Sequence, residues 1–217
     1  MFMNFTKTLL AAAALTACIG ANATVVASLG TGVGPFLTPT GSSTACTGAN
    51  CQISPITTGI TGGRVLANGF PNADPVLNNV TFLSAGPTNN GSATVSLVSG
   101  ISFISFLWGS PDDTPGFVNT VTVNSMFGGA MFSQSYTPSS LGFGPNVVGN
   151  QDPSANQYVS FSAVSGHSIT GLVFASTKDA FEATNFSVTP IPEPETYALM
   201  LAGLAALGFV SKRRKQA

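Results

Sequence analysis

The residues with the clearest potential for chemistry are Trp108, Asp112 and Asp113, which follow the apolar run 101–107 in the order Trp-Gly-Ser-Pro-Asp-Asp. Trp108 is the chain's only tryptophan, and the two aspartates are its only adjacent carboxylates. A tryptophan at a strand end could stack on a sugar ring, and loop carboxylates beside carbonyls are the usual donors to Ca²⁺. The structural alternative is a tryptophan packed at the core edge, followed by a turn whose aspartates accept backbone N–H bonds. Because the spacing is not Asp-x-Asp-x-Asp, the pattern favours the turn and leaves calcium as the alternative.

Cysteine and histidine are too few for a zinc site. The chain has three cysteines and one histidine, and Cys18 lies in the N-terminal segment. Cys46 and Cys51 remain, spaced C-x4-C. In an oxidising compartment such a pair is most simply a disulfide that closes a small loop, with free thiols as the alternative. Four zinc ligands cannot be assembled from this set. Apart from the calcium alternative, we therefore expect no cofactor.

The sequence predicts that the protein is not an enzyme. A serine hydrolase needs a histidine base, and His167 lies between Gly166 and Ser168, a pattern typical of a solvated turn. A glycosidase needs two carboxylates at a set separation. Glu182, in a strand-like run, is expected to face outward without a visible carboxylate partner. No catalytic residue is assigned.

The charge of the middle of the chain excludes one class of partner. Residues 24–191 contain two basic and six acidic side chains, a net charge of −4. Nothing there could neutralise the phosphates of a nucleic acid. The polar surface must instead consist of Ser, Thr, Asn, Gln and Gly, which suits a protein that lies outside the cell among polysaccharide.

The elements that would position these residues are β-strands. Hydrophobic side chains alternate with polar ones around Val95 and around Val121, the period of a half-buried strand. The run 101–107 is more apolar and is expected to be covered on both faces. The predicted core consists of large apolar residues of these and later strands: Phe103, Phe106, Val121, Val123, Phe161, Val173 and Phe186.

Three further strand-length runs, 158–164, 169–176 and 181–188, are separated by short connectors. Such spacing predicts an antiparallel meander. Frequent Gly and Pro exclude long helices, and several short strands at regular spacing favour an all-β, antiparallel β-sandwich or jelly-roll-like domain over residues 76–190.

The segment 24–75 is rich in Gly, Thr and Ser and is expected to be poor in strands. One or two edge strands are predicted there, around 25–29 and 64–66. A disordered stretch is the alternative.

The N-terminal segment 1–23 has the parts of a secretory signal peptide. Lys7 supplies the positive region, an apolar stretch follows, and Ala21-Asn-Ala23 is a small-x-small cleavage site. These parts predict export through the Sec translocon and cleavage by signal peptidase before Thr24. Leu15-Thr-Ala-Cys18 also resembles a lipobox, so lipidation of Cys18 is the alternative.

The C-terminal segment 191–217 has three parts. Pro192-Glu193-Pro194 reads as an extended peptide, because proline cannot sit inside a helix and biases the preceding residue toward extended conformations. The uncharged run 197–210 predicts one short transmembrane helix, although it is shorter than the roughly 20 residues that span a bilayer comfortably. Four cations follow and would stay on the cytoplasmic side: Lys212, Arg213, Arg214 and Lys215.

The order of these three parts resembles the PEP-CTERM sorting signal of bacterial surface proteins, whose tail is also catalogued as an ice-binding protein C-terminal domain. The resemblance implies recognition by an exosortase at Pro-Glu-Pro. It also implies anchoring in the inner membrane of a Gram-negative bacterium, followed by delivery to the cell surface or the extracellular matrix. That second name describes the sorting segment and does not by itself indicate ice binding.

A second resemblance covers residues 101–195. Trp-Gly-Ser-x-Asp after an apolar strand, and the later stretch 173–182, are similar to a subgroup of exosortase-dependent surface proteins. Pro111 and Pro115 depart from that pattern and stiffen the loop. The subgroup has no assigned activity. The expectation is a structural or matrix-interacting surface protein in contact with exopolysaccharide; the alternative is a carbohydrate- or ice-binding module.

Overall fold

The computed structural model describes residues 24–30, 32, 34–67, 80–144, 155–178, 181–190, 200 and 202–204. Between residues 24 and 190 the described ranges form twelve strands and one short helix. In chain order they are β1 (Val25–Gly30), β2 (Thr47–Gly48), β3 (Thr57–Thr61), β4 (Arg64–Leu66), β5 (Phe82–Ala85), β6 (Ala93–Gly109), β7 (Asp113–Thr114), β8 (Phe117–Phe127), β9 (Ala130–Tyr136), α1 (Pro138–Leu141), β10 (Gln157–Ala163), β11 (Ser168–Ser176) and β12 (Phe181–Pro190). All strand pairs are antiparallel, which confirms the predicted all-β, antiparallel class.

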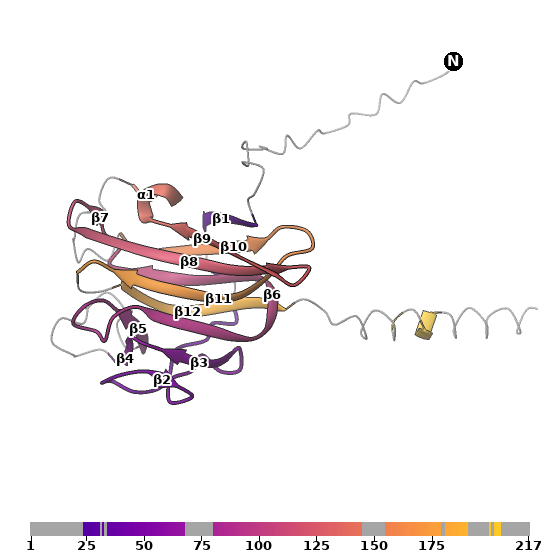
Figure 1. Cartoon of the computed structure of the whole chain (residues 1–217), viewed down its shortest axis with the longest axis horizontal. Coiled ribbons are helices and arrows are strands. Elements are labelled where there is room, and N and C mark those ends of the chain that lie inside the picture. Colours follow the sequence, from indigo (N-terminus) through magenta and orange to yellow (C-terminus); the bar gives the residue numbers. More distant parts are fainter. Residues whose placement is uncertain are drawn as a thin grey trace, which may run out of the picture.

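The 17-residue strand β6 organises one curled sheet (Figure 1). Its first part pairs with β3 and β11, and its second part pairs with β10 and β12. The first wing of the sheet therefore runs β2-β3-β6-β11-β8-β9, and the second wing runs β1-β10-β6-β12-β5-β4. Gly100 lies where β6 changes partners, and a Cβ there would be only 2.7 Å from the Cβ of Ser168. Close approach of β11 therefore requires glycine at this position.

The core lies where the two wings face each other. Phe174 of the first wing meets Phe106 of the second edge-on, with ring centroids 5.1 Å apart. Tyr136 on β9 packs against Phe161 on β10 at 5.1 Å, and its hydroxyl donates to the carbonyl oxygen of Val25 on β1. Burial raises the pKa of Tyr136 to about 12. The hydrogen bond from Tyr136 to Val25 therefore joins the edge strand β9 of the first wing to the edge strand β1 of the second.

Most of the predicted core is correct, but two residues were assigned to the wrong face. Five predicted core residues are completely buried: Phe106, Val121, Val123, Phe161 and Phe186. Phe103 and Val173 are only half-buried, because the inward positions of their strands are Ile104 and Phe174. The expectation that Glu182 faces solvent is also wrong: β12 lies between β5 and β6, and Glu182 is 1% exposed.

The three C-terminal strands exist, but the predicted meander is wrong. β10 and β12 both pair with the second part of β6, whereas β11 pairs with the first part of β6 and with β8. The short connectors therefore cross from one wing to the other. Connector length limits the distance between strand ends, but it does not decide whether two strands pair.

The segment 24–67 contributes more strands than its composition predicts. β1 and β4 are present as the expected edge strands, and β2 and β3 are additional. Side chains of this segment, such as Ile53 and Ile60, are completely buried in the main core.

The predicted signal peptide, the Pro-Glu-Pro element and the basic tail lie outside the described residues. Residues 200 and 202–204 of the predicted transmembrane run are helical. None of the helical segments that the structure describes has both the length and the apolar character of a membrane span.

Candidate functional site

Trp108, the residue with the most obvious binding chemistry, lies inside the core. Its indole is completely buried, stacks on Phe181 with centroids 4.4 Å apart and meets Phe143 edge-on at 5.5 Å. Its Nε1–H has no hydrogen-bond partner among the described residues. The indole face is therefore covered by protein, and stacking on a sugar would require the core to open.

The loop after Trp108 is a turn held by asparagine side chains. The amide group of Asn119 donates to the carbonyl oxygen of Ser110 at 2.7 Å, and the N–H of Ser110 donates to Oδ1 of Asn156 at 3.1 Å. The N–H of Asn119 donates to the carbonyl oxygen of Asp112 at 2.8 Å. β7 then pairs with the start of β8. This geometry favours the structural interpretation of Ser-Pro-Asp-Asp.

The carboxylate of Asp113 is hydrogen-bonded to the first turn of the neighbouring helix α1. Its Oδ2 accepts the N–H of Ser139 at 2.8 Å, in the first turn of α1. Partial burial raises the pKa of this carboxyl, but hydrogen bonds from Ser139 and Thr137 outweigh it and hold the pKa below its ordinary value. The first N–H groups of a helix have no partner within the helix, so a carboxylate that accepts from them is stabilising.

A metal site is not apparent around these aspartates. Asp112 is buried, Asp113 is half-buried, and no cluster of three or more His, Cys, Asp or Glu side chains occurs within the described ranges. One oxygen of Asp113 is already used by Ser139. Calcium at this loop stays a prediction.

His167 lies in the predicted turn between β10 and β11, but it is not simply solvated. Its ring is half-buried, stacks on Phe127 at 4.8 Å and meets Phe132 at 5.4 Å. Its Nδ1 has no hydrogen-bond partner in the described part of the chain. The ring therefore packs on aromatic side chains at the end of the β8–β9 hairpin.

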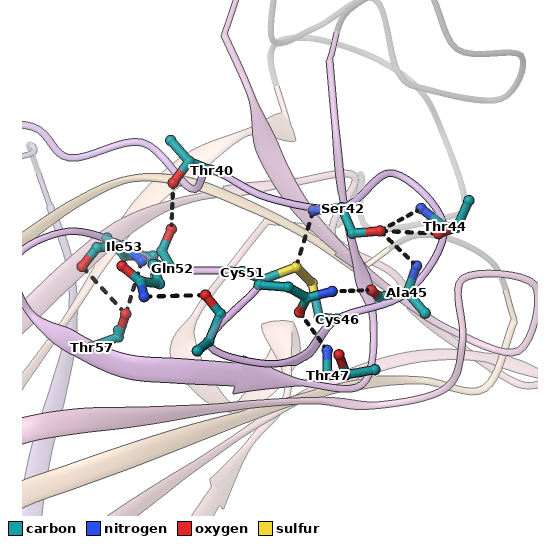
Figure 2. Close-up of a disulfide and its surroundings, with 12 residues drawn as sticks. Thr40, Ser42, Thr44, Ala45, Cys46, Thr47, Cys51, Gln52, Ile53 and Thr57 are labelled. Atoms are coloured by element: carbon teal, nitrogen blue, oxygen red, sulfur yellow. Dashed lines mark hydrogen bonds between the residues drawn. A yellow bond between two sulfur atoms is a disulfide. The ribbon is translucent and has the colours of Figure 1, made fainter.

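The Cys46–Cys51 disulfide is confirmed (Figure 2). The two Cα atoms are 5.4 Å apart, and both cysteines are buried in the main core. The N–H of Ser42 contacts Sγ of Cys51 at 3.3 Å, and Asn50 spans the loop by accepting from Thr47 and donating to Ala45. The bond therefore fixes the loop that leads into β3.

Replacing both Cys46 and Cys51 by serine is expected to lower the free energy of unfolding by about 2 kcal/mol, because the closed loop is short. Chemical denaturation of the wild type and the double variant measures this change. Alkylation and peptide mapping of the exported wild-type protein should find neither cysteine modified before reduction. Two reactive thiols in the folded wild type would contradict the prediction.

A feature that the sequence did not reveal is a lateral row of hydroxyl side chains on the outer face of the first wing. Directly paired positions on six strands form it, in the order Ser135, Thr122, Val173, Thr94, Thr61 and Thr47. All six are exposed or half-buried, and only Val173 lacks a hydroxyl. We call this set the hydroxyl row.

Polar side chains flank the hydroxyl row. The hydroxyls of Thr122 and Ser135 are 2.8 Å apart, and in the next row Ser133 donates to Oδ1 of Asn124 at 2.8 Å. Thr58 donates to the carbonyl oxygen of Ser96. The hydroxyl row thus presents uncharged donors and acceptors at the spacing of strands, about 4.8 Å.

Comparison with known proteins identifies the C-terminal segment. Residues 190–215 match the family model described as the PEP-CTERM protein-sorting motif. No curated protein and no solved structure matches the chain. The matched residues contain the three parts distinguished in the sequence: Pro-Glu-Pro, the apolar run and the cations. The chain therefore carries a PEP-CTERM protein-sorting motif at residues 190–215, which implies exosortase-dependent sorting of a secreted surface protein.

Proposed function

We propose that the protein is a structural or matrix-interacting component of the bacterial surface, with a sandwich-like ectodomain and no enzymatic activity. The PEP-CTERM motif at residues 190–215 carries this proposal. The buried Cys46–Cys51 disulfide supports it, because such bonds persist in oxidising compartments outside the cytoplasm.

In the proposed route, the Sec translocon exports the chain and signal peptidase removes residues 1–23. The apolar run 197–210 holds the precursor in the inner membrane, with Lys212–Lys215 on the cytoplasmic side. The exosortase then acts at Pro192-Glu-Pro194. The finished protein lies at the cell surface or in the extracellular matrix, in contact with exopolysaccharide.

Truncation after Ile191 tests this route. We expect the truncated chain to be exported but not retained at the surface, because it lacks the whole signal. Cell fractionation and immunodetection compare it with the intact chain. Equal surface retention of both chains would contradict the proposal.

A second function, binding of neutral polysaccharide, is favoured by the hydroxyl row. Polysaccharides are recognised through hydroxyl groups, and the hydroxyl row offers uncharged hydroxyls on five of its six strands. Ice is less favoured as the ligand, because successive strands of a twisted sheet rotate by roughly 20° and do not present a flat array. The sheet here is also curled (Figure 1).

Replacing Thr61 and Thr94 by valine removes two neighbouring hydroxyls while keeping side-chain shape. We expect binding to the host's purified extracellular polysaccharide to weaken about thirtyfold, since each of the two lost hydrogen bonds contributes about 1 kcal/mol. The matched control is Ser28→Ala with Ser160→Ala, a hydroxyl pair 2.8 Å apart on the second wing. Co-sedimentation measures binding. Equal affinity of the two double variants would contradict a role for the hydroxyl row.

A further inference from the structure

Strand β9 is an edge strand with unusual exposure. Among the described residues it pairs with β8 alone, in continuous register from Val121↔Tyr136 to Phe127↔Ala130. Its first four residues are exposed whichever face they point to; Met131 is 60% exposed and Phe132 38%. No other strand of the described residues pairs with its second long edge, which we call the open edge.

The turn identifies the backbone groups at this open edge. Gly128 and Gly129 have φ values of 57° and 84°, which indicate a two-residue type I′ turn. In such a hairpin the flanking pair, Phe127 and Ala130, exchanges both N–H···O bonds, and bonded pairs alternate along the strands. Positions 130, 132, 134 and 136 thus bond to β8, while 131, 133 and 135 direct their N–H and C=O groups to the open edge.

The open edge has defined ends. The next residue after Ser135 whose backbone groups could face the open edge is Thr137. Its N–H donates to Oγ of Ser140 at 2.9 Å, and its carbonyl oxygen accepts the N–H of Leu141, so both groups are already bonded. At the other end lies the Gly128–Gly129 turn. Within the described part of the chain, the open edge of β9 therefore offers backbone N–H and C=O groups to a further strand at three positions: Met131, Ser133 and Ser135.

The usual protection of an edge strand is missing from β9. Its sequence, Ala-Met-Phe-Ser-Gln-Ser-Tyr, contains neither charge nor proline, and its pairing with β8 shows no bulge. Natural proteins place lysine, proline or bulges on edges to prevent pairing with another chain. An unprotected edge with exposed Met and Phe side chains is a pairing surface.

We propose that β9 pairs antiparallel with β9 of a second copy of this chain, about a two-fold axis at Ser133. In this register Ser133 lies opposite Ser133 of the second copy, and Met131 lies opposite Ser135 on either side. It is the one register that uses all three open positions. An antiparallel edge is complementary to itself, as a two-fold dimer requires, and the absence of charge removes like-charge repulsion.

The contact continues the first wing of one copy into the first wing of the other. Phe132 lies opposite Gln134 of the second copy, so the exposed ring gains a neighbour across the axis. The pairing uses neither the sorting motif nor the hydroxyls of the other strands, and it stands independently of the proposed function.

Cysteine cross-linking of the full-length protein tests the register. Ser133→Cys should form a covalent dimer on mild oxidation, because Cα atoms of a bonded antiparallel pair lie about 5.5 Å apart, within disulfide range. Ser135→Cys alone and Met131→Cys alone should form no covalent dimer, since each residue lies about 13 Å from its own copy across the axis. A mixture of these two variants should cross-link. Thr94→Cys, exposed in the middle of the first wing, is the control for random collision.

Non-reducing electrophoresis gives the readout, with circular dichroism as a check of folding. A folded Ser133→Cys protein that stays monomeric, or that cross-links no better than Thr94→Cys, would overturn the proposal. A product whose mass is not twice that of the chain would show that the edge takes a different protein, which also overturns it.

Proline substitution gives a second test without a new cross-link. Ser133→Pro removes one N–H at the open edge of each copy, at positions where proline is tolerated. Two hydrogen bonds across the axis are lost, so dimerisation of the folded protein should weaken about thirtyfold in sedimentation analysis. Gln134→Pro removes an N–H that bonds to β8 and should instead destabilise the hairpin. Undiminished dimerisation of Ser133→Pro would contradict β9 pairing.

Discussion

A chain with Pro194→Ala or Glu193→Ala is expected to accumulate as an unprocessed precursor retained in the membrane. Proline biases the residue before it toward extended conformations, and we expect either substitution to disturb the extended peptide that the sorting enzyme must read. The apolar run and the cations are intact in these variants, so the proposed anchoring should persist. Fractionation with immunodetection of precursor and mature sizes measures the block. Pro115→Ala, in the exposed turn before β8, is the control for loss of a proline elsewhere.

Deleting Lys212–Lys215 should fail in a different way. In the proposed route these four cations oppose translocation of the tail, and without them the full-length protein should be released into the periplasm or the medium. The substitutions in Pro-Glu-Pro therefore test recognition by the exosortase, and the deletion of the cations tests anchoring in the membrane. If both produced the same retained precursor, the division of roles within residues 190–215 would be wrong.

The largest effect on stability is expected for Phe106→Ala, at about 3–5 kcal/mol of unfolding free energy. Phe106 is completely buried, and its ring lies 5.1 Å from that of Phe174 and 5.5 Å from that of Phe186. Truncation would leave a cavity between the two wings. Denaturant unfolding followed by circular dichroism measures the change.

Phe103→Ala is the matched control, because Phe103 lies on the same strand but on its half-buried outer face. It removes the same atoms with less lost burial and should cost clearly less. Equal destabilisation by the two substitutions would contradict the assignment of Phe106 to the inner face of β6.

Local hydrophobic patterns predicted the strands well where alternation is strict. Val121 and Val123 are buried between polar neighbours, as their spacing indicated. The run 101–107 has apolar residues at irregular intervals, so its sequence did not indicate which side of Phe103 or Ile104 faces the core. That choice depends on the partner strands, which are distant in sequence.

Pairing between distant strands also explains what was missed at the candidate sites. The hydroxyl row joins Thr47 and Ser135 through four intervening strands, and no local pattern encodes that register. Trp108 has a strand-end position in the sequence, yet Phe181, from β12, covers its face. By contrast, the disulfide and the sorting motif depend on short spacings and were predicted directly.

The most direct test of exosortase-dependent sorting is the mass of the C-terminal peptide of the protein recovered from the cell surface. Processing at the sorting motif predicts a terminus upstream of the apolar run, with Lys212–Lys215 absent. The same measurement on Pro194→Ala should return the uncleaved tail in the membrane fraction. Surface protein that still ends at Ala217 would contradict the account.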